Sequence, residues 1–228
     1  RERLRASGVD ADALNAATWR RVMDPFPDEW HEAGNALYFS DDGELPLETI
    51  ALLTMYPTRD VLIAIGSQML WLSSFLIGGD GATVFLDQDC SITAGDIYCG
   101  AQSRIVLHGP VVATRNAIID ARNGGSVLAD GDQLWAANVY IATDDMHRIE
   151  DLTTGERINP YGAHIRLGRH VWLSRDAVIT GHSDVGDGAI VGQSSLVRGQ
   201  KIPAHTAVAG TPARVVRENV AWTEEDTP

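Results

Sequence analysis

The chain of 228 residues is poor in cysteine and in basic side chains. Its two cysteines, Cys90 and Cys99, have no further cysteine to support a disulfide or a metal pair, so we expect both to be small buried residues. Eighteen Lys and Arg against 31 Asp and Glu give a formal net charge of −13. This deficit argues against nucleic acid as a partner, because binding phosphates requires basic surface.

The sequence shows no signal peptide, and we expect a cytoplasmic protein. Residues 61–79 contain no charged side chain and are about long enough for a marginal membrane span. Five residues interrupt the apolar run: Gly66, Ser67, Gln68, Ser73 and Ser74. We therefore expect a strand over Val61–Ile65 followed by the first buried coils. A transmembrane helix and a weak contact with a membrane surface are the alternatives.

A six-residue repeat runs through the C-terminal part of the chain. Seven of its nine positions are Leu, Ile or Val: Leu167, Leu173, Ile179, Val185, Val191, Val197, Pro203, Ala209 and Val215. Four residues after each position the side chain is usually small, as at Ala177, Ser183, Ala189, Ser195, Ala207 and Ala213.

A strict period of six is neither helical nor that of a half-buried strand, which repeat every 3.6 and every two residues. A short fixed period is typical of a solenoid, and a hexapeptide repeat is typical of a parallel β-helix. We expect the aliphatic side chains to point into one continuous core and the small ones to lie where coils crowd. Accidental spacing in an ordinary apolar sheet is the alternative.

The repeat divides the chain into three regions. Residues 1–60 are predicted to form a small mixed α/β module with helices over Ala11–Val22 and Leu45–Met55, the second opened by Pro46. Residues 61–216 form the all-β solenoid, with a looser period from about Ile77. Residues 217–228 form a tail, and a short helix or strand before it caps the stack.

Between residues 148 and 163 the repeat stops. Such an insertion leaves a solenoid as an excursion from one face, and excursions of this kind often form the binding face.

Three motifs around and after this interruption are distinctive. A D-x-H pattern ends at His147 and precedes the segment TGERIN, a rung reads H-V-W-L at 170–173, and the repeat closes with G-x-P-A-R-V at 210–215. With these motifs the chain resembles, over roughly residues 77–222, the hexapeptide-repeat acyltransferases of bacterial polysaccharide pathways. This family is related to galactoside and maltose O-acetyltransferases. The resemblance implies a left-handed β-helix, acetyl-CoA as acyl donor and a homotrimer with active sites between subunits.

The resemblance assigns His147 as the catalytic base. An alcohol must lose its proton as it attacks a thioester, and imidazole titrates close to working pH. Asp145 could hydrogen-bond the other ring nitrogen and fix its tautomer. The alternatives are a solvated turn at Asp144 and Asp145 and a surface-loop histidine at 147.

Three other histidines could suggest a metal site. His164, His170 and His182 all lie three residues after an expected inward position. If three hexads make one coil, His164 and His182 stack one coil apart on the outside of one corner. A zinc site needs at least three convergent protein ligands. We therefore expect no metal.

A coenzyme site is indicated independently by charge. Residues 188–217 contain no Asp or Glu, where the average composition would place about four. The same window contains four cations: Arg198, Lys201, Arg214 and Arg217. A basic patch in an acidic protein suits the phosphates of coenzyme A, and arginine is well shaped to bind them. A solvated basic edge is the alternative.

The resemblance refines this site. It matches Arg214 and Arg217 to the arginines after the closing G-x-P and adds Gln193 and Trp172, the latter in the pantetheine channel. Lys201 matches less closely, because the segment before it is one residue longer than in the family. Trp172 packing between subunits is the alternative.

The sequence as a whole thus predicts an acetyl-CoA-dependent O-acetyltransferase that modifies a hydroxyl of a sugar or glycoconjugate. Transfer to an amino-sugar nitrogen or to a small non-sugar hydroxyl compound is the alternative among enzymes. A catalytically silent trimeric scaffold is the alternative outside them.

Overall fold

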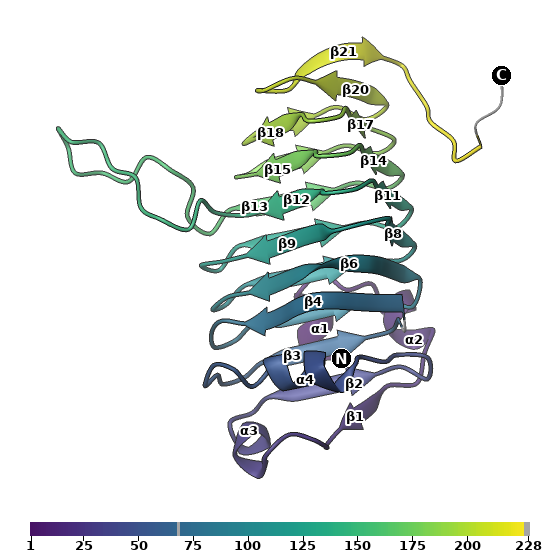
Figure 1. Cartoon of the computed structure of the whole chain (residues 1–228), viewed down its shortest axis with the longest axis vertical. Coiled ribbons are helices and arrows are strands. Elements are labelled where there is room, and N and C mark those ends of the chain that lie inside the picture. Colours follow the sequence, from purple (N-terminus) through teal and green to yellow (C-terminus); the bar gives the residue numbers. More distant parts are fainter. Residues whose placement is uncertain (68, 226–228) are drawn as a thin grey trace.

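Short parallel strands are stacked in coils along the long axis of the molecule (Figure 1). The structure, a computed structural model, describes residues 1–67 and 69–225. Strands pair with those one coil away, as Trp172 does with Ile190. In the regular part, positions one coil apart are 18 residues apart in the chain, as for Arg166 and Asp184. Three hexads therefore make one coil of a three-sided parallel β-helix.

The first face of the β-helix is a nine-stranded sheet. In spatial order it contains β1 (Arg20–Val22), β2 (Ala36–Phe39), β3 (Leu62–Ile65), β5 (Thr83–Leu86), β7 (Arg104–Leu107), β10 (Ser126–Ala129), β13 (His164–Leu167), β16 (Ser183–Val185) and β19 (Lys201–Ile202).

The second and third faces belong to one folded twelve-stranded sheet. The second face contains β8 (Val111–Ala113), β11 (Gln133–Trp135), β14 (Val171–Leu173), β17 (Ile190–Val191), β20 (Thr206–Ala209) and β21 (Arg214–Glu218). The third contains β9 (Ala117–Ala121), β12 (Tyr140–Ala142), β15 (Val178–Thr180) and β18 (Leu196–Arg198). The long strands β4 (Met69–Ile77) and β6 (Cys90–Cys99) join the two faces, since β6 pairs with both β8 and β9.

The hexad repeat forms the buried core. All six aliphatic positions from Leu167 to Val197 are buried, which contributes about 1.5–3 kcal/mol for each side chain. Cys90 and Cys99 are free and buried, as predicted, and burial raises the pKa of both thiols.

The predicted inward positions are wrong in the last coil. Pro203 and Val215 are exposed and Ala209 is half-buried. The coil is one residue shorter here, because Asp184 pairs with Lys201 rather than with the residue 18 positions on. Ile202 and Val208 therefore take the buried positions predicted for Pro203 and Ala209. Val215 lies on β21, which runs antiparallel to β20 and is exposed along its whole length.

The corner between the second and third faces needs residues that tolerate a left-handed backbone. Asn116, Asn138 and Asp176 occupy it with φ near +60°. Their side chains form a ladder, in which Asn116 donates to Asn138 at 3.2 Å and Asn138 donates to Asp176 at 3.0 Å. The sequence thus stabilises the bend with the same residues that permit it.

Two short helices, α1 (Glu2–Ala6) and α2 (Ala11–Asn15), cover the outer side of the first face. Leu4 and Leu14 pack there against Phe85 and Val106. The helix predicted over Ala11–Val22 is wrong beyond Asn15. The Trp19 indole donates to the Leu14 carbonyl at 3.1 Å, which ends the helical hydrogen bonding, and residues 20–22 form β1 instead.

The remaining N-terminal elements close the base of the stack. They are α3 (Asp28–Glu32) and α4 (Leu47–Leu52). The second predicted helix is α4, which starts after Pro46 and is shorter than predicted. Because β2 pairs in parallel with β3, the first face already begins within residues 1–60.

Residues 61–79, the uncharged segment, form β3 and β4 on either side of Gln68, which lies outside the described residues. The strand predicted over Val61–Ile65 is confirmed as β3. Within residues 1–67 and 69–225, no helix has the length and apolar character that crossing a membrane requires. The weak membrane-surface contact stays a prediction.

Candidate active site at the excursion

The predicted excursion projects from the corner between the third and first faces, where the chain leaves β12 and returns at β13 (Figure 1). A bridge between Glu150 and Arg157 joins its two arms. At its root the buried side chain of Asn159 accepts from the Ile149 backbone at 2.8 Å and donates to the His147 carbonyl at 2.7 Å. The backbone of His147 is therefore held in place.

Asp144 anchors the excursion to the stack. Its carboxylate is buried and accepts hydrogen bonds from Asn123 at 2.5 Å and from the backbone of Gly162 and Ala163 at 3.1 and 3.3 Å. These bonds tie the departing and returning ends of the excursion together. The solvated turn considered from the sequence is therefore wrong for Asp144.

Asp145 and His147 lie next to one another at the root of the excursion. The His147 side chain is exposed, and its backbone N–H donates to the Asp145 carbonyl at 2.7 Å. The Asp145 carboxylate accepts from the Arg198 guanidinium at 2.8 Å. A residue predicted to orient the base is thus paired with one predicted to bind the coenzyme.

Trp172 lies on the outer side of the second face beneath the C-terminal tail. The Trp222 indole stacks on His170 with ring centroids 4.0 Å apart and lies 6.1 Å from the Trp172 ring. Trp222 Nε1 donates to the His170 carbonyl at 2.9 Å, and the His170 ring also contacts Asp132 at 2.7 Å. The tail therefore covers part of the predicted pantetheine wall.

The other predicted coenzyme residues lie in the upper coils but on different sides of the β-helix. Arg198 ends β18 and Lys201 begins β19, so these two flank one corner. Arg214 and Arg217 are exposed on β21, the last strand of the second face, which pairs antiparallel with β20. Gln193 is exposed in the turn after β17. The single chain therefore brings these residues together in part only.

The predicted histidine pair is confirmed. The rings of His164 and His182 lie 5.7 Å apart on the outside of one corner, and His182 Nδ1 accepts from the His164 backbone at 3.1 Å. Burial, then the neighbouring His182 and Arg104, lower the pKa of His164. In the part of the chain that the structure describes, no three His, Cys, Asp or Glu side chains converge as a metal site would require.

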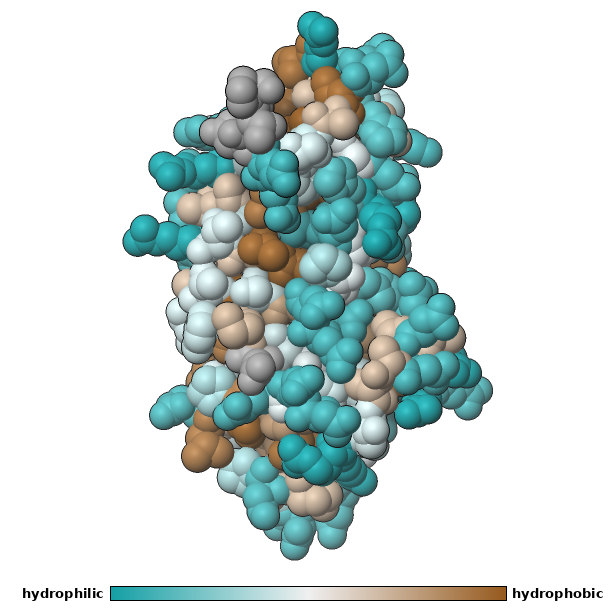
Figure 2. Space-filling view, turned by 90° about the vertical axis from the view of Figure 1, so that its right-hand side faces the viewer, coloured by the Kyte–Doolittle hydropathy of each residue, from teal (hydrophilic) through white to brown (hydrophobic). Residues whose placement is uncertain are grey.

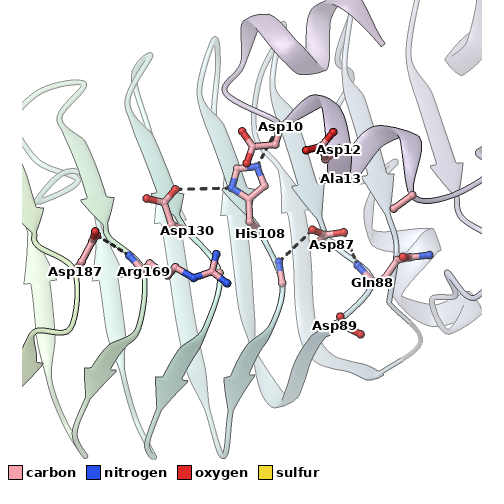
Figure 3. Close-up of a pocket in the computed structure, with 13 residues that line it drawn as sticks. Asp10, Asp12, Ala13, Asp87, Gln88, Asp89, His108, Asp130, Arg169 and Asp187 are labelled. Atoms are coloured by element: carbon pink, nitrogen blue, oxygen red, sulfur yellow. Dashed lines mark hydrogen bonds and ion pairs between the residues drawn. The ribbon is translucent and has the colours of Figure 1, made fainter. Parts of the chain in front are cut away.

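A hollow of about 630 Å³ lies elsewhere, between α2 and the turns that follow strands of the first face (Figure 3). His108 stands in it between Asp10, whose backbone N–H donates to His108 Nε2 at 3.1 Å, and Asp130. Six aspartates line the hollow. This acidic lining would repel the phosphates of a coenzyme, and none of the predicted site residues is among it.

A charged cluster on the third face was not predicted from the sequence. Asp120 and Arg122 form two hydrogen bonds of 2.7 and 2.8 Å, and the Arg122 guanidinium lies 3.8 Å over the Tyr98 ring. Burial raises the pKa of the Asp120 carboxyl, against the opposing effect of Arg122. The signal is a D-x-R spacing at the end of a strand. Asp120 lies in β9 and Arg122 directly follows its last residue, and side chains two residues apart in an extended chain point to the same side.

In its fold and motifs the chain resembles one class of proteins, the hexapeptide-repeat acetyltransferases with a left-handed β-helix. Comparison with known proteins confirms this resemblance. The chain is 32% identical over 101 residues to Escherichia coli K12 WbbJ, named as an O-acetyl transferase of lipopolysaccharide biosynthesis, covering 41% of this chain and 50% of WbbJ. It is 28% identical over 134 residues to the polysialic acid O-acetyltransferase of E. coli O1:K1, covering 58% and 42%.

A solved structure supports the same fold. The crystal structure of the polysialic-acid-specific acetyltransferase NeuO matches with a TM-score of 0.65 and 25% identity, covering 75% of this chain and 78% of that one. The chain spans half or less of the length of the two curated relatives. No family model matches it.

Proposed function

We propose that the chain is an O-acetyltransferase that moves an acetyl group from acetyl-CoA to a hydroxyl of a sugar or glycoconjugate. The observation that supports it best is the placement of His147. Its backbone is held by Asn159 at the root of an excursion from a β-helix, while its imidazole is exposed. The named relatives, which are O-acetyltransferases, support the same activity.

In the proposed reaction His147 acts as the general base. Its neutral imidazole accepts the proton of the acceptor hydroxyl as that oxygen attacks the thioester carbonyl. The C–O bond forms, the C–S bond breaks, and the coenzyme leaves as a thiolate that takes up a proton. Asp144 and Asn159 hold the base in position at the root of the excursion and do not themselves contact the reacting atoms.

The donor site in this proposal is the acid-free window of the upper coils. Arg214 and Arg217 on β21 supply exposed guanidinium groups for the phosphates, and Lys201, whose side chain is 82% exposed, is a further cation. Trp172, Gln193 and Arg198 complete the proposed set. Trp222 covers Trp172, so the tail would form part of the pantetheine wall or move aside.

A trimer would unite groups that one subunit holds apart. The excursion leaves the corner between the third and first faces, whereas Arg214 and Arg217 belong to β21, the last strand of the second face. The second face also presents an outward line of mainly apolar residues in continuous register: Met69, Ser91, Val112, Leu134, Trp172, Ile190 and Ala207. Figure 2 shows apolar patches along this side. A closed ring that packs this face against a neighbour would unite base and donor site.

Light scattering should therefore give a mass of three times 24.6 kDa. Val112→Asp, which places a charge within the apolar line, should shift the protein toward monomers. Leu47→Asp is the control, because Leu47 is 69% exposed on α4 and lies outside this line. A wild-type monomer at micromolar concentration would contradict a shared site.

Release of thiol from acetyl-CoA in the presence of a sugar panel tests the activity itself. We expect release that depends on both acetyl-CoA and a hydroxylated sugar, with an acetyl ester as product. Transfer to an amino-sugar nitrogen would give an amide and favour the alternative acceptor. A chain that neither binds nor turns over acetyl-CoA would be a scaffold.

A further inference from the structure

The Tyr98–Asp120–Arg122 cluster has no evident structural need. It lies on the outer side of the third face, where apolar or small residues would be sufficient. The Asp120 side chain is 10% exposed and that of Arg122 is 26% exposed, so both charges are largely removed from water. Removing such a pair from water costs several kcal/mol per ion before their attraction compensates it. Packing alone therefore gives no reason for a charged pair on the outside of the solenoid.

The cluster is connected to the proposed base through the backbone. Asp120 pairs with Ala142, the last residue of β12 before the excursion. Thr143 donates its backbone N–H to the Asp120 carbonyl, and its hydroxyl accepts from the Arg122 backbone, both at 2.9 Å. The cluster therefore lies directly beneath the root of the excursion, where an acceptor would lie.

The chemistry of the cluster suits an uncharged sugar ring. A carboxylate accepts hydrogen bonds from neighbouring hydroxyls, and a guanidinium donates to ring and hydroxyl oxygens. Tyr140 of β12 pairs with Ile118, two residues before Asp120, so its side chain lies on the same outer face and its hydroxyl is a further group that a sugar could bind. Because Asp120 already neutralises Arg122, the pair offers hydrogen bonds but little net charge.

Two of the three arginines around the excursion are neutralised in the same way, and the third, Arg157, is held by uncharged carbonyls. Arg148 donates to Glu150 at 2.8 Å, and Arg198 donates to Asp145 at 2.8 Å. Arg157 donates to the carbonyls of Asn159 and Pro160 at 3.1 and 3.0 Å. Residues 143–163 also contain five carboxylates against two arginines. This surface would repel a polyanion.

We infer that the acceptor binds over Tyr98, Asp120 and Arg122 as an uncharged, hydroxyl-bearing sugar, in contrast to the anionic polysialic acid for which two of the similar proteins are named. This inference rests on the proposed function and specifies its acceptor.

The test compares acceptors with the full chain at saturating acetyl-CoA. The panel contains neutral gluco-, galacto- and manno-oligosaccharides, polysialic acid, and an oligogalacturonate beside its methyl ester. The last two share one sugar backbone, and the ester replaces each carboxylate charge by a neutral methyl ester. We expect the best neutral acceptor to exceed every anionic one at least tenfold in kcat/KM. An anionic glycan that matches or exceeds it would overturn the inference and uphold the O-acetyltransferase. Absence of transfer to any hydroxyl would overturn both.

Variants locate the acceptor. Asp120→Asn combined with Arg122→Gln removes both charges together and leaves neither buried alone. We expect it to raise KM for the neutral acceptor at least tenfold, with the affinity for acetyl-CoA within twofold of wild type. Arg5→Gln, on α1, is the control and should change neither value. If circular dichroism shows that the double variant is unfolded, Tyr98→Leu is measured in its place and should likewise raise the KM for the neutral acceptor. An unchanged acceptor KM in the folded variant would overturn the assignment.

Discussion

His147→Ala should lower kcat by about 10²- to 10⁴-fold with the true acceptor, the usual loss when a general base is removed. The fold should be retained, because the side chain of His147 is exposed and the excursion is held through its backbone and through Asp144. The affinity for acetyl-CoA should also be retained, since Arg214 and Arg217, the main proposed phosphate-binding residues, lie on β21 at the end of the stack. Steady-state kinetics and calorimetric titration with acetyl-CoA measure the two quantities separately.

His31→Ala is the matched control for this variant. His31 belongs to α3 at the base of the stack, remote from the excursion (Figure 1). It should leave both kcat and the affinity for acetyl-CoA unchanged. Removal of a general base usually leaves a hundredth or less of the wild-type kcat, at about 10²- to 10⁴-fold loss. If His147→Ala keeps more than about a tenth of the wild-type kcat, His147 is not the base.

Much of the fold follows from the period of the sequence. Aliphatic residues at every sixth position can be buried together only if each hexad forms one side of a coil, which is why the core from Leu167 to Val197 was predictable. The shift of the buried position from Pro203 to Ile202 was not predictable. A corner that is one residue shorter leaves the six-residue pattern of apolar side chains almost unchanged. The end of α2 depended on a hydrogen bond from Trp19 to Leu14, which no helix propensity describes.

The candidate site was predictable where it follows from motifs and not where it follows from contacts between coils. His147 and the basic window can be read directly from the chain. The pair of Asp145 and Arg198 joins residues 53 positions apart, and Arg122 stacks on Tyr98 from a neighbouring coil. A repeat defines which side chains point outward, but it does not define which of them meet.

The pairing of Asp145 with Arg198 also changes how these residues are understood. A side chain that already binds a carboxylate at 2.8 Å must exchange it before it can bind a phosphate. Arg198 is therefore a weaker candidate for the donor phosphates than Arg214 and Arg217. These two are exposed on β21 and, among the described residues, neither forms an ion pair with a carboxylate, although Glu218 follows Arg217 in the chain. The two β21 arginines make the sharper test of the donor site.

Arg214→Ala and Arg217→Ala should each weaken acetyl-CoA binding by roughly 1.5–3 kcal/mol, the cost of a lost charge-assisted hydrogen bond, which is a factor of roughly 10–150 in Kd. The acceptor KM should change little, because the proposed acceptor residues lie on the third face. Calorimetric titration gives the donor affinity directly. Raising the salt concentration should weaken acetyl-CoA binding more in the wild type than in the variants. Salt screens the attraction between arginine and phosphate, which the variants have already lost in part.

Arg169→Ala is the matched control for the donor site. Arg169 is also exposed and basic, but it lines the acidic hollow and lies outside the acid-free window. Its removal should leave the affinity for acetyl-CoA within twofold of wild type. Equal binding of acetyl-CoA by the wild type and the Arg214→Ala/Arg217→Ala double variant would show that the phosphates bind elsewhere. Such a result would contradict the proposed donor site but would not test the role of His147, so the proposed reaction would stand.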